Sequence, residues 1–193
     1  MSTLPPIWLL DVDGVINAIS AKPDRNVWPA DQWTTGTARC AGTAWPILAA
    51  RPVVRFIREA HESGRAEVRW HTTWQHEAAA IAELLDLPEF QVQHCPEFVQ
   101  AAQPLAGLRP TGPAWWKLPA AERVVNEEGR ALLWTDDDAD WELRPHGGQD
   151  ALARIQPTLI ICPGRHIGLS PKNLRHIDAF LQHFTPTQTG AQR

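Results

Sequence analysis

Short apolar runs alternate with amphipathic segments along the 193-residue chain, and this alternation predicts strands that alternate with helices. Apolar runs predict buried strands at 7–10, 66–70, 131–135 and 159–162, and residues 90–93 predict a short edge strand. Glu67 and Arg69 make the second run more polar than a central parallel strand normally is. The alternation favours a three-layer, Rossmann-like α/β fold with a parallel sheet of about five strands.

Each predicted helix carries its apolar residues on one side. The first begins near Pro52 and ends at Gly64, with apolar positions spaced i, i+3, i+4 and i+7. Two more helices are predicted at 76–87 and at about 119–128. Ser170, followed by proline, predicts the start of a final helix. The apolar side of that helix comprises Leu174, Ile177, Leu181 and Phe184.

Residues 18–50 lack periodicity and are rich in turn formers, which predicts a long loop or small hairpin that forms a flap after the first strand. Its tryptophans, Trp28, Trp33 and Trp45, either line a substrate entrance beside basic residues or anchor the loop against the core. We interpret 1–184 as a single domain with no large cap, followed by a polar tail at 185–193.

The composition is that of an ordinary globular protein, with 44% hydrophobic residues, 21% charged residues and a net charge of −4. This charge gives no sign of a surface that coats nucleic acid. The three cysteines are widely spaced, and no apolar stretch approaches the length of a membrane span. We therefore expect a cytoplasmic protein. Lysine is scarce, with only Lys22, Lys117 and Lys172, so each lysine position is informative.

Two carboxylates follow the first predicted strand, at Asp11 and Asp13, and Gly14 comes directly after them. Aspartate is a poor strand former, so a pair of aspartates at this place indicates a role other than folding. Glycine allows a tight turn and a close approach of a ligand. Ligands of open parallel sheets bind beyond the carboxyl ends of the strands. The pattern therefore indicates a site for a cation and a phosphate, or an equivalent electrophile.

Three later motifs accompany this pair in the order used by one known superfamily. The second predicted strand leads to Thr72, Lys117 precedes the third helix, and the next strand ends in Asp136 and Asp137. Together with Asp11-x-Asp-Gly, these positions resemble the four motifs of the haloacid dehalogenase (HAD) superfamily over residues 7–162. A weaker resemblance is to the small HAD domains of actinobacterial and RNA-repair-associated proteins. The resemblance implies the strand order 3-2-1-4-5.

The resemblance also implies the catalytic roles. Asp11 would be the nucleophile that attacks phosphorus, and Asp13 would protonate the leaving oxygen and then deprotonate water. Thr72 would hydrogen-bond a phosphoryl oxygen, and Lys117 would neutralise the charge that develops on it. Within the superfamily, the carboxylate of Asp13 favours a phosphatase, because the dehalogenase branch lacks a carboxylate at this position.

A cofactor follows from the same motifs. Carboxylates and a phosphate repel one another, so a hard divalent cation is needed between them. The implied Mg²⁺ ligands are Asp11, the backbone carbonyl of Asp13, Asp136 and Asp137, with Asp140 as the alternative second acid of the last motif. The spacing of His71, His76 and His94 fits no standard zinc site, so we do not predict zinc.

The sequence thus predicts a Mg²⁺-dependent phosphohydrolase that acts on a phosphomonoester through an aspartyl-phosphate. One alternative is a phosphatase of nucleic-acid ends or nucleotides. Another, from a different class, is a non-catalytic HAD-like module that binds a metal or a partner. Without a cap, an open site favours a phosphate on an extended molecule, such as a nucleic-acid end or a protein. Trp74 and the pair 115–116 are expected near the rim, where packing is favoured over stacking on a substrate ring.

Overall fold

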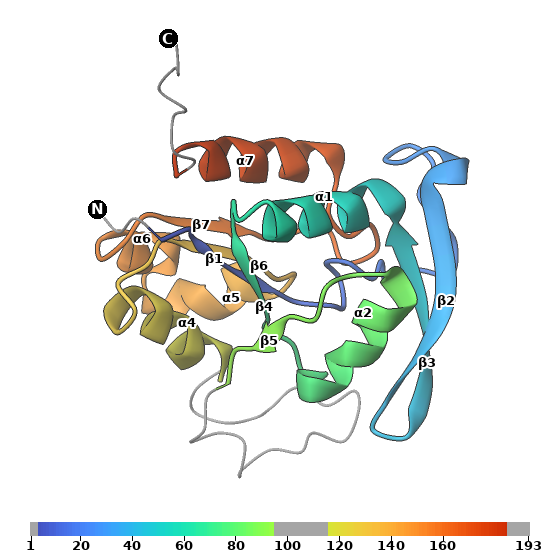
Figure 1. Ribbon diagram of the computed structural model, residues 1–193, viewed down its shortest axis with the longest axis horizontal. Coiled ribbons are helices and arrows are strands. Elements are labelled where there is room, and N and C mark those ends of the chain that lie inside the picture. The colour runs from blue at the N-terminus through green and yellow to red at the C-terminus, as the bar shows by residue number, and fades with distance from the viewer. Residues whose placement is uncertain (1–3, 95–115, 185–193) are drawn as a thin grey trace, which may run out of the picture.

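The computed structural model describes residues 4–94 and 116–184, and its main feature is a five-stranded parallel sheet flanked by helices (Figure 1). The neighbouring strands all pair in parallel. In sheet order the strands are β5 (Gln91–Val92), β4 (Glu67–Trp70), β1 (Ile7–Leu10), β6 (Leu132–Thr135) and β7 (Thr158–Ile161). The predicted α/β class with a parallel sheet is therefore correct.

The strand numbering differs from the predicted 3-2-1-4-5 because two further strands intervene along the chain. β2 (Trp33–Cys40) and β3 (Thr43–Ala50) form a separate antiparallel hairpin and take no part in the main sheet. The observed order is β5-β4-β1-β6-β7, and β1 occupies the centre, between β4 and β6. The carboxyl end of β1 therefore has a neighbouring strand end on each side.

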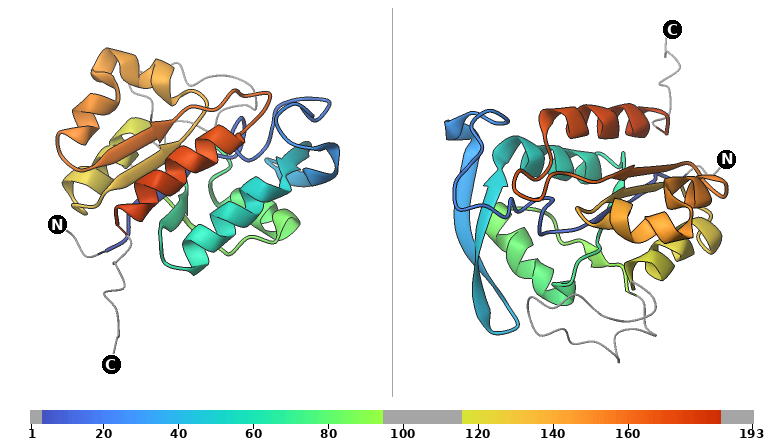
Figure 2. Two further views of the ribbon diagram at one scale, coloured as in Figure 1. Left: turned by 90° about the horizontal axis from the view of Figure 1, so that it is seen from above. Right: turned by 180° about the vertical axis from the view of Figure 1, so that it is seen from behind.

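Helices cover both faces of the sheet (Figure 2). Successive residues of a strand point to opposite faces, so Trp8 packs in one apolar cluster and Leu9 in the other. The Trp8 face is covered by α1 (Arg51–Glu62) and α7 (Pro171–Gln182). The Leu9 face is covered by α4 (Lys117–Asn126), α5 (Ala139–Leu143) and α6 (Gly148–Ala153). These are the three layers that the sequence pattern predicts.

The remaining helices differ more from the predictions. The helix predicted at 76–87 is a 3-10 turn, η2 (Gln75–Ala78), that leads into the shorter α2 (Ala79–Leu85). Two further 3-10 turns are η1 (Ala30–Gln32) and η3 (Arg144–His146). The predicted cap of α7 is confirmed, because Ser170 and Asn173 form reciprocal hydrogen bonds. Among the described residues, no helix combines the length and apolar character needed to cross a membrane.

The insertion at 18–50 contains the β2–β3 hairpin, which lies beside α2 (Figure 1). Two of its three tryptophans are buried, and their indole N–H groups donate to carbonyls: Trp28 to Leu169 at 3.1 Å and Trp33 to Trp28 at 3.1 Å. These two side chains anchor the segment. Trp45 is exposed and is the one that remains available on the surface.

Candidate active site

The predicted site residues meet at the carboxyl ends of the three central strands. Leu10, the last residue of β1, is in register with Trp70 at the end of β4 and with Thr135 at the end of β6. Asp11 and Asp136 directly follow β1 and β6, and Thr72 lies two residues beyond β4. Parallel pairing therefore brings together three side chains that are far apart in the sequence.

Lys117, the first residue of α4, lies between the two strand-end aspartates. Its Nζ donates to Asp11 Oδ2 at 2.5 Å and to Asp136 Oδ2 at 2.5 Å, and all three side chains are buried. Burial lowers the pKa of Lys117, but attraction by the two carboxylates outweighs burial and holds the pKa above its ordinary value. Lys117 is therefore cationic at neutral pH.

For the carboxylates, in contrast, the net pKa shift favours the neutral form. Burial raises the pKa of Asp11, and Lys117 and a hydrogen bond with Thr72 only partly oppose this. Burial, followed by repulsion from Asp11, raises the pKa of Asp136 to about 6 despite the charge of Lys117. Burial also raises the pKa of Asp137 to about 6, with repulsion from neighbouring carboxylates. The cluster therefore holds more negative charge than its neighbouring cations balance.

Gly14 allows Asp137 to approach the turn after β1. Its φ is +74°, a conformation that favours glycine, and a Cβ built on it would lie 2.4 Å from Asp137 Cγ. Any larger residue would displace this carboxylate. The predicted need for glycine at this turn thus has two separate reasons, the backbone conformation and the space for Asp137.

Three carboxylates are placed to share one cation. One oxygen each from Asp11, Asp136 and Asp137 lies within 4.8 Å of the others, and within the described ranges no other group of three or more His, Cys, Asp or Glu does this. Carboxylate oxygens suit a hard divalent cation, and the surplus negative charge favours one. Three of the four predicted metal residues are thus together. No described contact tests the backbone carbonyl of Asp13, which stays a prediction.

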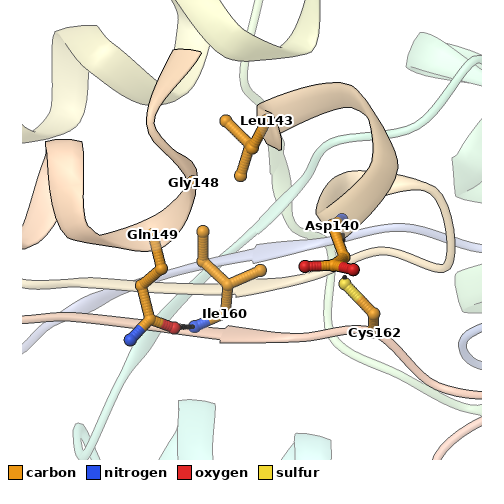
Figure 3. A pocket seen from close by; sticks show the side chains of 6 residues that line it. All are labelled: Asp140, Leu143, Gly148, Gln149, Ile160 and Cys162. Carbon is orange, nitrogen blue, oxygen red and sulfur yellow. Dashed lines mark hydrogen bonds between the residues drawn. The ribbon is translucent and has the colours of Figure 1, made fainter. Parts of the chain in front are cut away.

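Asp140, the alternative second acid, does not belong to this group. Its backbone N–H lies 3.1 Å from Cys162 Sγ, in a separate small pocket of about 210 Å³ between α5, α6 and β7 (Figure 3). Leu143, Gly148, Gln149 and Ile160 also line this pocket. Asp137 therefore supplies the second acid of the cluster.

The carboxylate of Asp13 is held by two donors. Asn17 Nδ2 donates to Oδ1 at 2.8 Å, and Trp74 Nε1 donates to Oδ2 at 2.9 Å. Asn17 is fixed in turn, because its Oδ1 accepts a hydrogen bond from the N–H of Leu48 in β3 at 2.9 Å. Trp74 is buried, as predicted, but it also orients a proposed acid–base group.

His71 is buried next to the site and stacks on Trp116, with ring centroids 5.3 Å apart. Burial and, after it, the charge of Lys117 hold the pKa of His71 well below its ordinary value of 6.5. The imidazole is therefore neutral, and it adds no charge beside Thr72. Trp115, the other member of the tryptophan pair expected near the rim, lies outside the described residues, as does Cys95.

Sequence reasoning missed Asn17 and Arg165. Arg165 lies in the loop after β7, and its Nε is 3.2 Å from Asp137 Oδ2. The available signal was its position in a loop at the carboxyl end of a strand, where ligand-binding residues of such sheets lie. Asn17 gave no comparable signal, because a polar residue in a turn is ordinary.

In comparisons with known proteins, no family model, curated protein or solved structure matched this chain. The resemblance to the HAD superfamily therefore stays a hypothesis that rests on the motif residues. The structure establishes an α/β protein with a five-stranded parallel sheet and a cluster of aspartates beside one buried lysine.

Proposed function

We propose that this protein is a Mg²⁺-dependent phosphohydrolase that cleaves a phosphomonoester through an aspartyl-phosphate on Asp11. The observation that supports this most is the cluster of Asp11, Asp136 and Asp137, two of which form ion pairs with the buried Lys117. A buried, unbalanced group of carboxylates costs stability, so its presence is better explained by chemistry than by folding.

The chain offers one group for each chemical step. A carboxylate oxygen of Asp11 attacks phosphorus, the bond from phosphorus to the leaving oxygen breaks, and Asp13 gives that oxygen its proton. Asp13 then takes a proton from water, which attacks the phosphorus of the aspartyl-phosphate and releases phosphate and free Asp11. The contacts from Asn17 and Trp74 hold Asp13 in one orientation through both steps. Lys117 and Thr72 stabilise the charge on the transferred group.

Electrostatics explain why a cation is part of the proposal. Two like charges 4 Å apart repel by about 4 kcal/mol at the effective dielectric of a protein surface, so a phosphate dianion is strongly opposed by this cluster. Asp11, Asp136 and Asp137 would hold Mg²⁺, which when bound would neutralise them and polarise the phosphoryl oxygens. The oxygen-only donor set and the raised pKa values of Asp136 and Asp137 fit such an ion.

An assay with p-nitrophenyl phosphate tests the activity. We expect turnover with Mg²⁺, no turnover in excess EDTA, and recovery when Mg²⁺ is restored. Full activity in excess chelator would contradict the proposed cation. Binding of Mg²⁺ by calorimetry without turnover of any phosphomonoester would instead favour the non-catalytic, metal-binding alternative.

For the substrate we propose a phosphate on an extended molecule, such as a nucleic-acid end. In support, the insertion after β1 contributes a two-stranded hairpin rather than a domain with its own core, and it leaves Trp45 exposed. A 5′-phosphorylated oligonucleotide should then have a higher kcat/KM than sugar phosphates and mononucleotides. A clear preference of the protein for a small sugar phosphate would contradict this part of the proposal.

A further inference from the structure

Arg165 contacts the aspartate cluster from the solvent-exposed side. Its Nε lies 3.2 Å from Asp137 Oδ2, and 49% of its side chain is exposed, against 8% for Asp137. Within the described parts of the chain, it is the only basic side chain that forms an ion pair with Asp137. Lys117, in contrast, is buried and contacts Asp11 and Asp136.

The backbone that carries Arg165 is fixed to the segment after the first motif. The N–H of Ile19 donates to the carbonyl of Arg165 at 2.8 Å, and the N–H of Leu169 donates to the carbonyl of Val15 at 2.9 Å. Gly168 has φ +70°, and a Cβ there would lie 2.6 Å from the Val15 carbonyl oxygen. The main chain is therefore held close to the site, whereas the long side chain of Arg165 can still change its direction.

Arg165 and a divalent cation would compete for the same carboxylate. Asp137 Oδ2 faces the guanidinium, and Asp137 also belongs to the group of three that could share an ion. A cation bound there would repel Arg165 and take up the charge of Asp137. The guanidinium, held nearby by its loop, would then present its N–H donors to an incoming phosphate, for which its planar geometry is well suited.

Resting on the proposed function, we propose that Arg165 is the counter-ion of Asp137 until a divalent cation displaces it, and that the displaced guanidinium binds the phosphate of the substrate. The structure thus assigns Arg165 two roles. It keeps the acidic cluster partly neutral in the absence of the cation, and it makes phosphate binding follow cation binding.

Calorimetry on the full chain tests both roles, with Mg²⁺ and inorganic phosphate as the probes. The variants are Arg165→Gln and Arg165→Lys. The matched control is Arg144→Gln, because Arg144 is also an exposed arginine beside an aspartate, at 3.5 Å from Asp140. Arg165→Gln should bind Mg²⁺ about twofold to fivefold more tightly, since a competing exposed ion pair is removed.

With Mg²⁺ at saturation, Arg165→Gln should bind phosphate about tenfold more weakly, because a charge-assisted hydrogen bond is lost. Arg165→Lys should keep an Mg²⁺ affinity near that of the unmodified protein but lose part of the phosphate affinity, since it retains the charge without the planar donors. Arg144→Gln should change neither affinity.

The inference is overturned if Arg165→Gln binds Mg²⁺ and phosphate as Arg144→Gln does. If Arg165→Gln fails to fold, Arg165→Lys still tests the inference, because lysine preserves the ion pair with Asp137. An unchanged phosphate affinity in Arg165→Lys would then overturn the inference. Absence of Mg²⁺ binding by the unmodified protein would overturn the proposed function first and this inference with it. The two failures are therefore distinguishable.

Discussion

The two ends of the central sheet each hold a cluster of charged side chains, and the clusters differ in how their charges balance. Near the amino ends of the strands, Glu67 of β4 accepts hydrogen bonds from Arg69, at 2.7 Å, and from Arg130. Arg69 also donates to both carboxylate oxygens of Glu128, at 2.8 and 2.9 Å. Two acids and two arginines are thus matched. This network explains why β4 is unusually polar for a central strand.

At the carboxyl ends, three aspartates lie close together, with a buried lysine paired to two of them and a half-exposed arginine paired to the third. The direction of the pKa shifts shows the contrast. Burial raises the pKa of Glu67, but the hydrogen bonds from Arg130 and Arg69 outweigh burial, and the pKa is lowered. Burial raises the pKa of Asp136 to about 6, and the available cations do not compensate. The acids of the matched cluster are stabilised in their charged form, whereas those of the unmatched cluster keep raised pKa values.

The largest expected effect is on catalysis, from Asp11→Asn. The amide keeps the shape of the side chain but cannot attack phosphorus, so turnover should fall by roughly 10⁴ to 10⁶, the scale seen when other nucleophiles are removed. The fold should persist, because the carboxylate contributes little apolar packing. Circular dichroism and the rate with p-nitrophenyl phosphate provide the check, and near-normal activity in a pure preparation would show that Asp11 is not the nucleophile.

The unmatched cluster also predicts a pH dependence of stability. The pKa of Asp137 is raised from 3.8 to about 6, so the folded state binds its proton more tightly than the unfolded state. Stability is therefore lost as the pH rises from about 4 to 6. Asp137→Asn removes this loss, and its Tm without metal should exceed that of the unmodified protein by roughly 2–6 °C at pH 7.

The control for that experiment is the same comparison below pH 4, where the two proteins should have nearly equal Tm. Adding Mg²⁺ at pH 7 should raise the Tm of the unmodified protein more than that of Asp137→Asn. Thermal melts from pH 3.5 to 7.5 provide the measurement. A constant difference in Tm across this range would mean that Asp137 carries no repulsive charge in the metal-free protein.

The sequence predicted the strands of the main sheet, and most clearly those that are continuous apolar runs, such as β1 and β6. β1 has the predicted bounds, and β4 begins one residue later than expected, at Glu67. The helices α5 and α6 were not predicted, because segments of five and six residues are too short to show helical periodicity. The hairpin was anticipated only as one alternative, since the threonines and alanines of β2 give no clear apolar alternation.

The site was predictable where it lies at the ends of strands. Asp11, Thr72 and Asp136 follow recognisable apolar runs, and parallel pairing then brings them together. The contacts of Arg165 and Trp74 depend on side-chain direction across distant loops, which local patterns do not encode. The resemblance to a known superfamily supplied the roles that we propose for these residues, whereas the charge imbalance became visible only from burial and distances.

Trp74→Phe should have a smaller effect on turnover. Phenylalanine retains most of the packing of the buried ring but removes the Nε1–H that donates to Asp13 Oδ2 at 2.9 Å. Loss of a residue that orients a reacting group typically costs about 10- to 100-fold, and we expect kcat to fall near the lower end of that range. The matched control is Leu48→Val, which also changes a buried side chain near the site but keeps the backbone N–H that donates to Asn17. A kcat equal to that of the control would remove Trp74 from the mechanism.

The smallest expected effect on activity comes from the matched cluster. Glu67→Gln keeps the shape of the side chain but removes the negative charge that pairs with Arg69 and Arg130. We expect a loss of about 1–2 kcal/mol in the free energy of unfolding, a loss that the partial exposure of Glu67 limits. Because the pKa of Glu67 is lowered, this stabilisation is present above its ordinary value of 4.5 and is lost as the pH falls below it. Asp137 shows the opposite sign, so urea unfolding of both variants at pH 3.5 and 7 separates the two clusters. Turnover per folded molecule should stay unchanged in Glu67→Gln, and a marked loss of turnover would show that the charges at the two ends of the sheet do not act independently.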